Sequence, residues 1–184
     1  MSEADPERAK VLERSVIRVL HVDDEAPIRL LSRVNLEADG MEVIEAANGR
    51  TGVQLAKREQ PDLILLGVMM PVLDGWQAAE ELRNDQETRE MPIVFLTAQS
   101  ELRHRARGFD LGAVDYILKP FNPVELAPRV RGLLERLERG ERDELRREKI
   151  SELRALKDAE QRRTRLPERV IALVETIRRR RGNL

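Results

Sequence analysis

The stretch "DLILLGVMMPVLDG", residues 62–75, is the most informative part of this chain for its architecture. Its first part is an apolar run of strand length, which stops at a Met-Met-Pro turn and is followed by a second turn at Asp-Gly. A run that is apolar at consecutive positions is typical of a strand buried on both faces of a parallel sheet. Gly67 stands where this strand should end and where its side chain would meet the loop.

The chain alternates strand-sized and helix-sized segments on both sides of this run. Five strands alternating with five helices predict right-handed crossovers and a doubly wound parallel α/β sheet covered on both faces. The other predicted strands are 16–22, 41–46, 92–96 and 115–118, and the predicted amphipathic helices are 27–38, 50–59, 75–83, 101–110 and 123–139.

Local signals refine these helices. Leu31, Val34 and Ala38 stand at helical spacing and give the first helix an apolar side. Asn122 before a proline predicts the start of the last helix, since asparagine is a good N-cap. Pro128 should kink that helix, because proline removes a backbone hydrogen bond.

Composition limits the classes of function. With 184 residues, 41% of them apolar, the chain can build one domain plus an appendage. The absence of cysteine excludes disulfides, thiolate metal sites and cysteine nucleophiles. Aromatic residues make up only 3%, which leaves little surface for stacking bases, so nucleic acid is an unlikely partner.

The sequence shows neither an apolar signal core nor a run long enough to cross a membrane, and we expect a cytoplasmic protein with no membrane contact.

We predict three parts: a flexible N-terminal arm at 1–14, a main domain at 15–139 and a charged helical extension at 140–184. From residue 138 onward the chain has 15 basic and 10 acidic residues, a net charge of +5, against 18 and 24, a net charge of −6, before it. The extension has a ragged apolar stripe, which favours docking on its own domain or pairing with a second copy. That stripe consists of Leu145, Ile150, Leu153 and Leu156.

Polar residues gather at the predicted strand ends. Asp23 and Asp24 follow the first strand, Thr97 the fourth and Lys119 the fifth. Ligands of a parallel sheet bind at the carboxyl ends of its strands. Carboxylates suit Mg²⁺, while a hydroxyl and an ammonium suit phosphate oxygens, so this edge is a candidate phosphoryl site.

Four motifs in order, "VLHVDDE", "DLILLGVMMPVLDG", "PIVFLTA" and "GAVDYILKPF", resemble the receiver domain of two-component response regulators. The resemblance implies a flavodoxin-like (βα)5 fold with strand order 2-1-3-4-5 and phosphotransfer from a histidine kinase. It also implies residue roles: Asp23, Asp24 and the backbone carbonyl of Met69 as magnesium ligands, Thr97 as the switch hydroxyl, Tyr116 as the aromatic switch, and Lys119 as the phosphoryl-contacting lysine, whose bond to Pro120 is often cis in the family.

Gly67 departs from this family pattern, which has the phospho-acceptor aspartate there. Glycine carries no carboxylate, so an acyl phosphate cannot form at this position. We expect Mg²⁺ binding to be weak or absent, and Lys119 to turn toward Asp23 or Asp24. Asp74 is expected to cap the next helix. Gly67 is either natural or a change from aspartate, and the protein sequence leaves both origins open.

The leading hypothesis is a non-enzymatic phosphorelay signalling protein that binds a sensor histidine kinase or a downstream signalling protein, possibly as a homodimer. One alternative is a phosphorylatable receiver with aspartate at position 67 and Mg²⁺-dependent phosphotransfer. The other is a DNA-binding regulator that uses the basic tail, which contains four arginines at 178–181.

Overall fold

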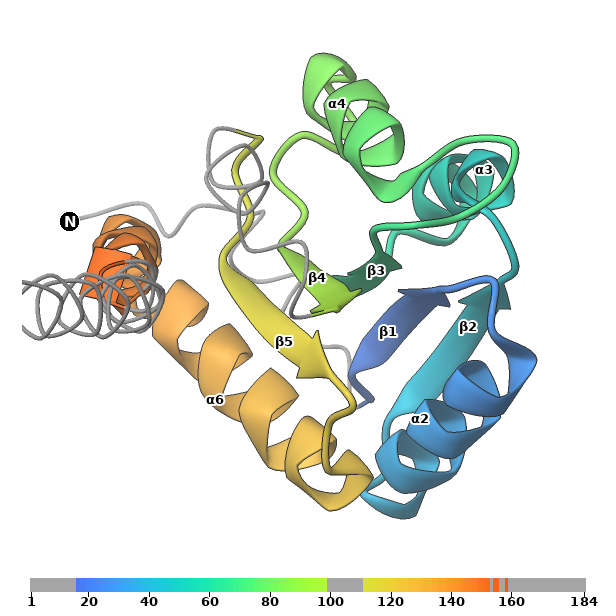
Figure 1. Cartoon of the computed structure of the whole chain (residues 1–184), viewed down its shortest axis with the longest axis horizontal. Helices are drawn as coiled ribbons and strands as arrows, with labels where there is room; N and C mark the ends of the chain where they lie inside the picture. The colour runs from blue at the N-terminus through green and yellow to red at the C-terminus, as the bar shows by residue number, and fades with distance from the viewer. Residues whose placement is uncertain (1–15, 99–110, 153, 156–157, 159–184) are drawn as a thin grey trace, which may run out of the picture.

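The computed structural model describes residues 16–98, 111–152, 154–155 and 158. Five parallel strands form one sheet in the order β2-β1-β3-β4-β5, which confirms the predicted topology (Figure 1). The predicted arm at 1–14, the predicted helix at 101–110 and the tail from 159 lie outside the described residues. The strands are β1 Arg18–Val22, β2 Glu42–Ala46, β3 Leu63–Gly67, β4 Ile93–Ala98 and β5 Asp115–Lys119.

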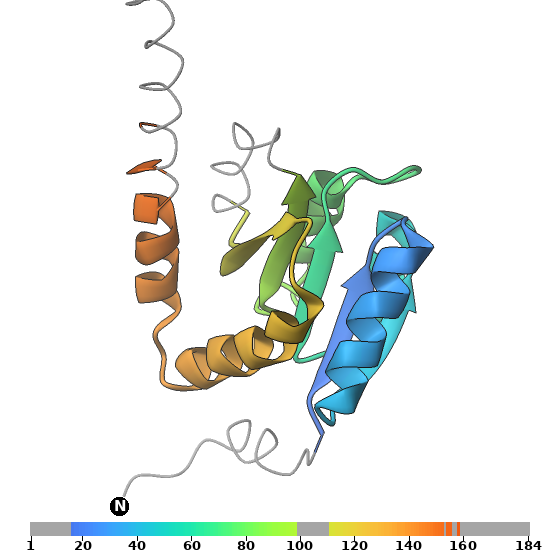
Figure 2. The same ribbon diagram turned by 60° about the horizontal axis from the view of Figure 1, so that its bottom comes forward.

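Helices cover both faces of the sheet: α2 and α6 lie on one side, α3 and α4 on the other (Figure 1). A further helix begins at residue 142, continues through 152 and stands beside β5 (Figure 2). None of the helices in the described part of the chain is both long and apolar enough to cross a membrane. The helices labelled in Figure 1 are α2 Ala26–Ala38, α3 Gly49–Glu59, α4 Gly75–Asn84 and α6 Leu126–Glu138. A 3-10 turn, η2 Pro123–Glu125, directly precedes α6.

Successive strand residues point to opposite faces, so the sheet has two cores. The core on the α3 and α4 side contains Leu20, Ile64 and Phe95. The core on the α2 and α6 side contains their neighbours Leu65 and Val94. All five side chains are completely buried, as expected for central strands of a parallel sheet.

The strands β3, β4 and β5 end one or two residues later than the sequence predicted. Gly67 pairs with Leu96, and Thr97 pairs with Leu118, so both belong to strands and do not follow them. Lys119 is likewise the last residue of β5. Parallel pairing continues to the edge of the sheet, and the candidate residues are therefore positioned by regular backbone.

The apolar side chosen for the first helix was wrong. Leu31 and Val34 are 44% and 54% exposed, whereas Ser32 and Leu36 face the sheet and are fully buried. Apolar residues occur on more than one side of this helix, so periodicity alone did not identify the buried side.

The start of the last helix also differs from the prediction. Asn122 does act as a cap, with its Oδ1 accepting the N–H of Val124 at 3.3 Å, but it caps the turn η2. Helix α6 begins at Leu126, which places Pro128 in its first turn. Backbone N–H groups there have no partner within the helix, so proline costs no hydrogen bond and does not interrupt α6.

Candidate functional site

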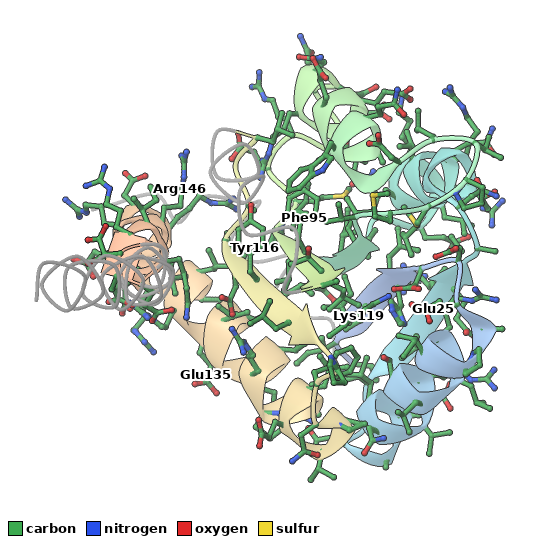
Figure 3. All side chains as sticks on the ribbon, viewed as in Figure 1. Glu25, Phe95, Tyr116, Lys119, Glu135 and Arg146 are labelled. Carbon is green, nitrogen blue, oxygen red and sulfur yellow. The ribbon has the colours of Figure 1, made fainter. Side chains whose placement is uncertain are left out.

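An ion pair lies at the carboxyl ends of the strands. Asp23 follows β1 and is fully buried, and its Oδ2 lies 2.6 Å from the Nζ of Lys119. The same Nζ donates to Oε1 of Glu25 at 2.9 Å (Figure 3). The prediction that Lys119 turns toward the acid pair is confirmed for Asp23. Glu25 was missed, although it directly follows the pair in the sequence.

Asp23 is fixed by further hydrogen bonds. Its Oδ1 accepts the backbone N–H of Glu25 at 3.0 Å, and its carbonyl accepts Nη1 of Arg29 at 2.6 Å. Its own N–H donates to the carbonyl of Ala46 at 3.0 Å. Oδ1 of the carboxylate is therefore held by a hydrogen bond and Oδ2 by the ion pair with Lys119.

The surroundings of Lys119 raise its pKa. Burial is the largest single influence and acts to lower the pKa, but the hydrogen bonds to Asp23 and Glu25 together outweigh it. Lys119 therefore remains protonated at neutral pH, and the ion pair persists. Its peptide bond to Pro120 is cis, as the resemblance suggested.

His21 lies in β1 and is completely buried. Within the described residues, neither of its ring nitrogens has a hydrogen-bond partner. Burial, together with the positive charges of Lys119 and Arg29, lowers the pKa of His21 to about 3. The ring is thus neutral at physiological pH. Nothing in the sequence pattern had singled it out.

Gly67 faces this ion pair. A β-carbon at position 67 would lie 3.0 Å from Oδ2 of Asp23 and 3.2 Å from the carbonyl oxygen of Val22. A side chain there would therefore point at the buried carboxylate. The segment that follows Gly67 returns to the end of β3 at Gly75, whose N–H donates to the carbonyl of Val68 at 2.8 Å.

Thr97 and Tyr116 occupy the neighbouring strands β4 and β5. Thr97 lies near the carboxyl end of β4, whereas Tyr116 is the second residue of β5 and pairs with Phe95. Thr97 is buried in β4, and its hydroxyl donates to the carbonyl of Ala98 at 3.4 Å. The Tyr116 ring is only 8% exposed and stacks on Phe95, with ring centroids 5.5 Å apart (Figure 3). The structure thus brings Asp23, Lys119 and Gly67 together. Of the two expected switch residues, Thr97 is on β4, between the strands of Gly67 and Lys119, and Tyr116 is on the same strand as Lys119.

The residues expected to bind magnesium have other contacts or are exposed in the structure. One oxygen of Asp23 contacts the Lys119 ammonium, and the other accepts a backbone N–H. Asp24 is exposed, and Met69 lies in the segment after β3 with its side chain 71% exposed. Across the described residues, no group of three or more His, Cys, Asp or Glu side chains could hold a metal ion. The metal-binding roles therefore stay predictions.

An exposed apolar surface adjoins the site on α2. Leu30, Leu31 and Val34 are 51%, 44% and 54% exposed and lie next to one another on the helix. Helix α2 starts three residues after Asp23. We call these three side chains the α2 stripe.

The sequence matches the model of the response regulator receiver domain over residues 19–131. It is 43% identical over 122 residues to the probable transcriptional regulator ycf27 of Porphyridium aerugineum, covering 66% of this chain and 50% of that protein. It is equally similar to the DNA-binding dual master transcriptional regulator RpaA of Synechocystis, covering 66% of this chain and 51% of that protein. The chain spans about half the length of the curated relatives that it matches.

The fold is similar to that of solved receiver proteins. A putative response regulator from Chloroflexus aurantiacus superimposes with a TM-score of 0.62 at 34% identity, covering 66% of this chain and all of that one. The expectation that nucleic acid is an unlikely partner is not borne out by the relatives, whose names describe transcriptional regulators.

Proposed function

The chain belongs to the response regulator receiver domain family, and from this premise we propose that it is a two-component signalling protein that acts through protein contacts and accepts no phosphoryl group at position 67. A sensor histidine kinase or a downstream signalling protein is the expected partner. The observation that carries the proposal is Gly67 at the end of β3. A side chain at this position would face Asp23, but glycine has none.

The ion pair supports this proposal. A receiver lysine that contacts a phosphoryl group must be available to it, but Lys119 is already bound to Asp23 and Glu25. The positive charge that would stabilise a phosphoryl group instead neutralises the buried carboxylate. We therefore assign no catalytic role to the chain with Gly67, and we expect its Mg²⁺ binding to be weak or absent.

A substitute acceptor is not favoured by the geometry. Asp74 follows the turn, and its Oδ1 accepts the N–H of Gln77 at 2.8 Å while Gln77 Oε1 accepts the N–H of Asp74 at 3.1 Å. This reciprocal pair is a capping box that begins α4. Asp74 therefore has a structural role, as the sequence predicted.

The α2 stripe is the surface that we assign to the kinase. Three adjacent apolar side chains on a helix suit packing against another helix, and they lie close to the strand ends at which a kinase would act. Thr97 and Tyr116 would then act as the internal switch through which the signalling state reaches other partners.

The test compares this chain with its Gly67→Asp variant. Each protein is incubated with a small phosphodonor and Mg²⁺, and the mass of the intact protein is measured. We expect a phosphoryl mass increase only in Gly67→Asp, and no increase when that variant also carries Lys119→Ala. A mass increase in the Gly67 chain would refute the proposal.

Calorimetric titration should show tighter Mg²⁺ binding by Gly67→Asp, because the added carboxylate competes with Asp23 for Lys119 and supplies another oxygen ligand.

Transcriptional regulation is the second candidate, favoured by the names of the relatives. The basic tail with its four arginines at 178–181 would supply phosphate contacts. A gel-shift titration with duplex DNA at low salt decides the matter, because phosphate contacts are strongest there. Absence of binding under those conditions removes this candidate for the chain.

A further inference from the structure

The helix at 142–152 packs across the edge of β5, which is the outer strand of the sheet (Figure 2). Leu145 is 1% exposed and joins the core on the α2 and α6 side. Ile150 packs against the other core, which contains Tyr116 and Phe95. The helix therefore contacts both layers of the domain and covers the β5 edge.

A buried carboxylate anchors this helix. Asp115, the first residue of β5, has a side chain only 2% exposed, and its Oδ2 lies 2.6 Å from Nε of Arg129 on α6. Its Oδ1 lies 3.5 Å from Nζ of Lys149 on the helix at 142–152. A buried carboxylate requires such partners, because an unpaired charge is costly in the interior.

The same charges hold the backbone of Tyr116. Its N–H donates to Oδ1 of Asp115 at 2.8 Å, and its carbonyl accepts Nη2 of Arg129 at 2.8 Å. Among the strands that the structure describes, β5 pairs with β4 alone, so these two backbone groups lie on the open edge and need side-chain partners. Asp115 Oδ1 is thus shared between Tyr116 and Lys149.

We propose that the β5 edge is a docking surface for an amphipathic helix, filled by this chain's own residues 142–152, and that its occupation holds Tyr116 in its inward position. Lys149 of the helix and the backbone N–H of Tyr116 share one oxygen of Asp115, and Ile150 of the helix packs against the core that contains the Tyr116 ring. Docking of the helix and the inward position of Tyr116 therefore stabilise each other, and this coupling is reciprocal. A signalling role for this coupling between the helix and Tyr116 rests on the proposed function, but the coupling itself does not.

The composition of the chain permits a direct test, since it has a single tyrosine and no cysteine. Nitration of Tyr116 by tetranitromethane, located by peptide mass mapping, reports its exposure in the full-length protein. In Lys149→Ala we expect nitration to be about fivefold faster, from loss of one partly buried ion pair. Lys149→Arg should retain the slow rate. The matched control is Arg147→Ala, an exposed cation on the same helix, and it should also leave the rate unchanged.

A second readout follows the helix. Leu145→Cys introduces the only thiol of the chain, and its reaction with a disulfide reagent reports undocking. In that background, Tyr116→Ala should speed the reaction several-fold, whereas Tyr116→Phe, which keeps the ring, should not. Far-UV circular dichroism verifies that each variant is folded.

The coupling is refuted if Lys149→Ala leaves Tyr116 nitration unchanged, or if Tyr116→Ala leaves thiol reactivity unchanged in a folded variant. Neither readout needs a phosphodonor or a kinase. Failure of the coupling is therefore distinguishable from failure of the proposed signalling function.

Discussion

Lys119 and Asp23 form an ion pair of 2.6 Å in which the aspartate is completely buried and the lysine side chain is 18% exposed. A second lysine–aspartate pair, Lys57 with Asp85, has the same 2.6 Å separation, but its side chains are 43% and 28% exposed. Burial is thus the main difference between two chemically identical pairs.

Removal of the lysine should therefore have different effects at the two sites. Lys119→Ala leaves Asp23 buried without its cation and should lower the free energy of unfolding by about 3 kcal/mol. Lys57→Ala should lower it far less, because water screens the exposed pair. Urea unfolding at pH 7, followed by circular dichroism, measures both. Equal losses would show that the Asp23 pair is not desolvated in solution.

The lowered pKa of buried His21 predicts that the folded protein loses stability as the pH falls. The folded protein keeps His21 neutral down to a pKa of about 3, whereas the unfolded chain protonates it near 6.5. Between these values the free energy of unfolding should fall by about 1.4 kcal/mol per pH unit, reaching a loss of about 2 kcal/mol at pH 5. The control is His21→Val, which lacks this titration. The difference between the two proteins, measured by urea unfolding at pH 7 and pH 5, isolates the histidine, and a constant difference would contradict the expectation.

Val72 has an unfavourable backbone conformation in the turn after β3. Its φ is +71°, a region that β-branched residues rarely adopt, and its side chain is 82% exposed. Val72→Gly should therefore raise the free energy of unfolding by about 1 kcal/mol, because it relieves strain without loss of packing. Val124→Gly is the matched control, also exposed but without positive φ, and it should not stabilise the protein. Thermal unfolding distinguishes the two variants.

The same substitution should have opposite effects at Gly75 and Gly132. A β-carbon on Gly75 would collide with the backbone of Gly67 and Val68, so Gly75→Ala should cost about 1–3 kcal/mol. Nothing lies within 4 Å of a β-carbon on Gly132, in the middle of α6, and Gly132→Ala should stabilise by about 0.5–1 kcal/mol. Denaturant midpoints of the two variants should move in opposite directions, and a stabilising Gly75→Ala would mean that the turn is looser than described.

The fold and part of the site could be predicted from the sequence because they depend on regular patterns. Alternating apolar strands and amphipathic helices specify the parallel sheet, and the site residues lie at the ends of its strands. The turn of Lys119 toward Asp23 followed from charge alone, once position 67 had no carboxylate. The cap formed by Asp74 followed from its place in the turn.

Other features depend on contacts between distant residues, which a local pattern does not contain. The buried side of α2 is chosen by how the helix sits on the sheet, and Ser32 faces inward although it is polar. Glu25 became part of the site only through the position of Lys119, 94 residues away. Asp115 resembled an ordinary first residue of a strand, and its role emerged from Arg129 and Lys149 on two later helices.

The two apolar contacts of the helix at 142–152 also determine where the polypeptide leaves the domain. Leu145 and Ile150 are seated in different cores, so the helix cannot rotate about its axis without losing one of them. Gly140, with a φ of +80°, makes the turn that brings the helix to this place. The orientation of the helix at 142–152 relative to the sheet is therefore set by both cores at once, and this orientation defines which way its residue 152 faces the domain.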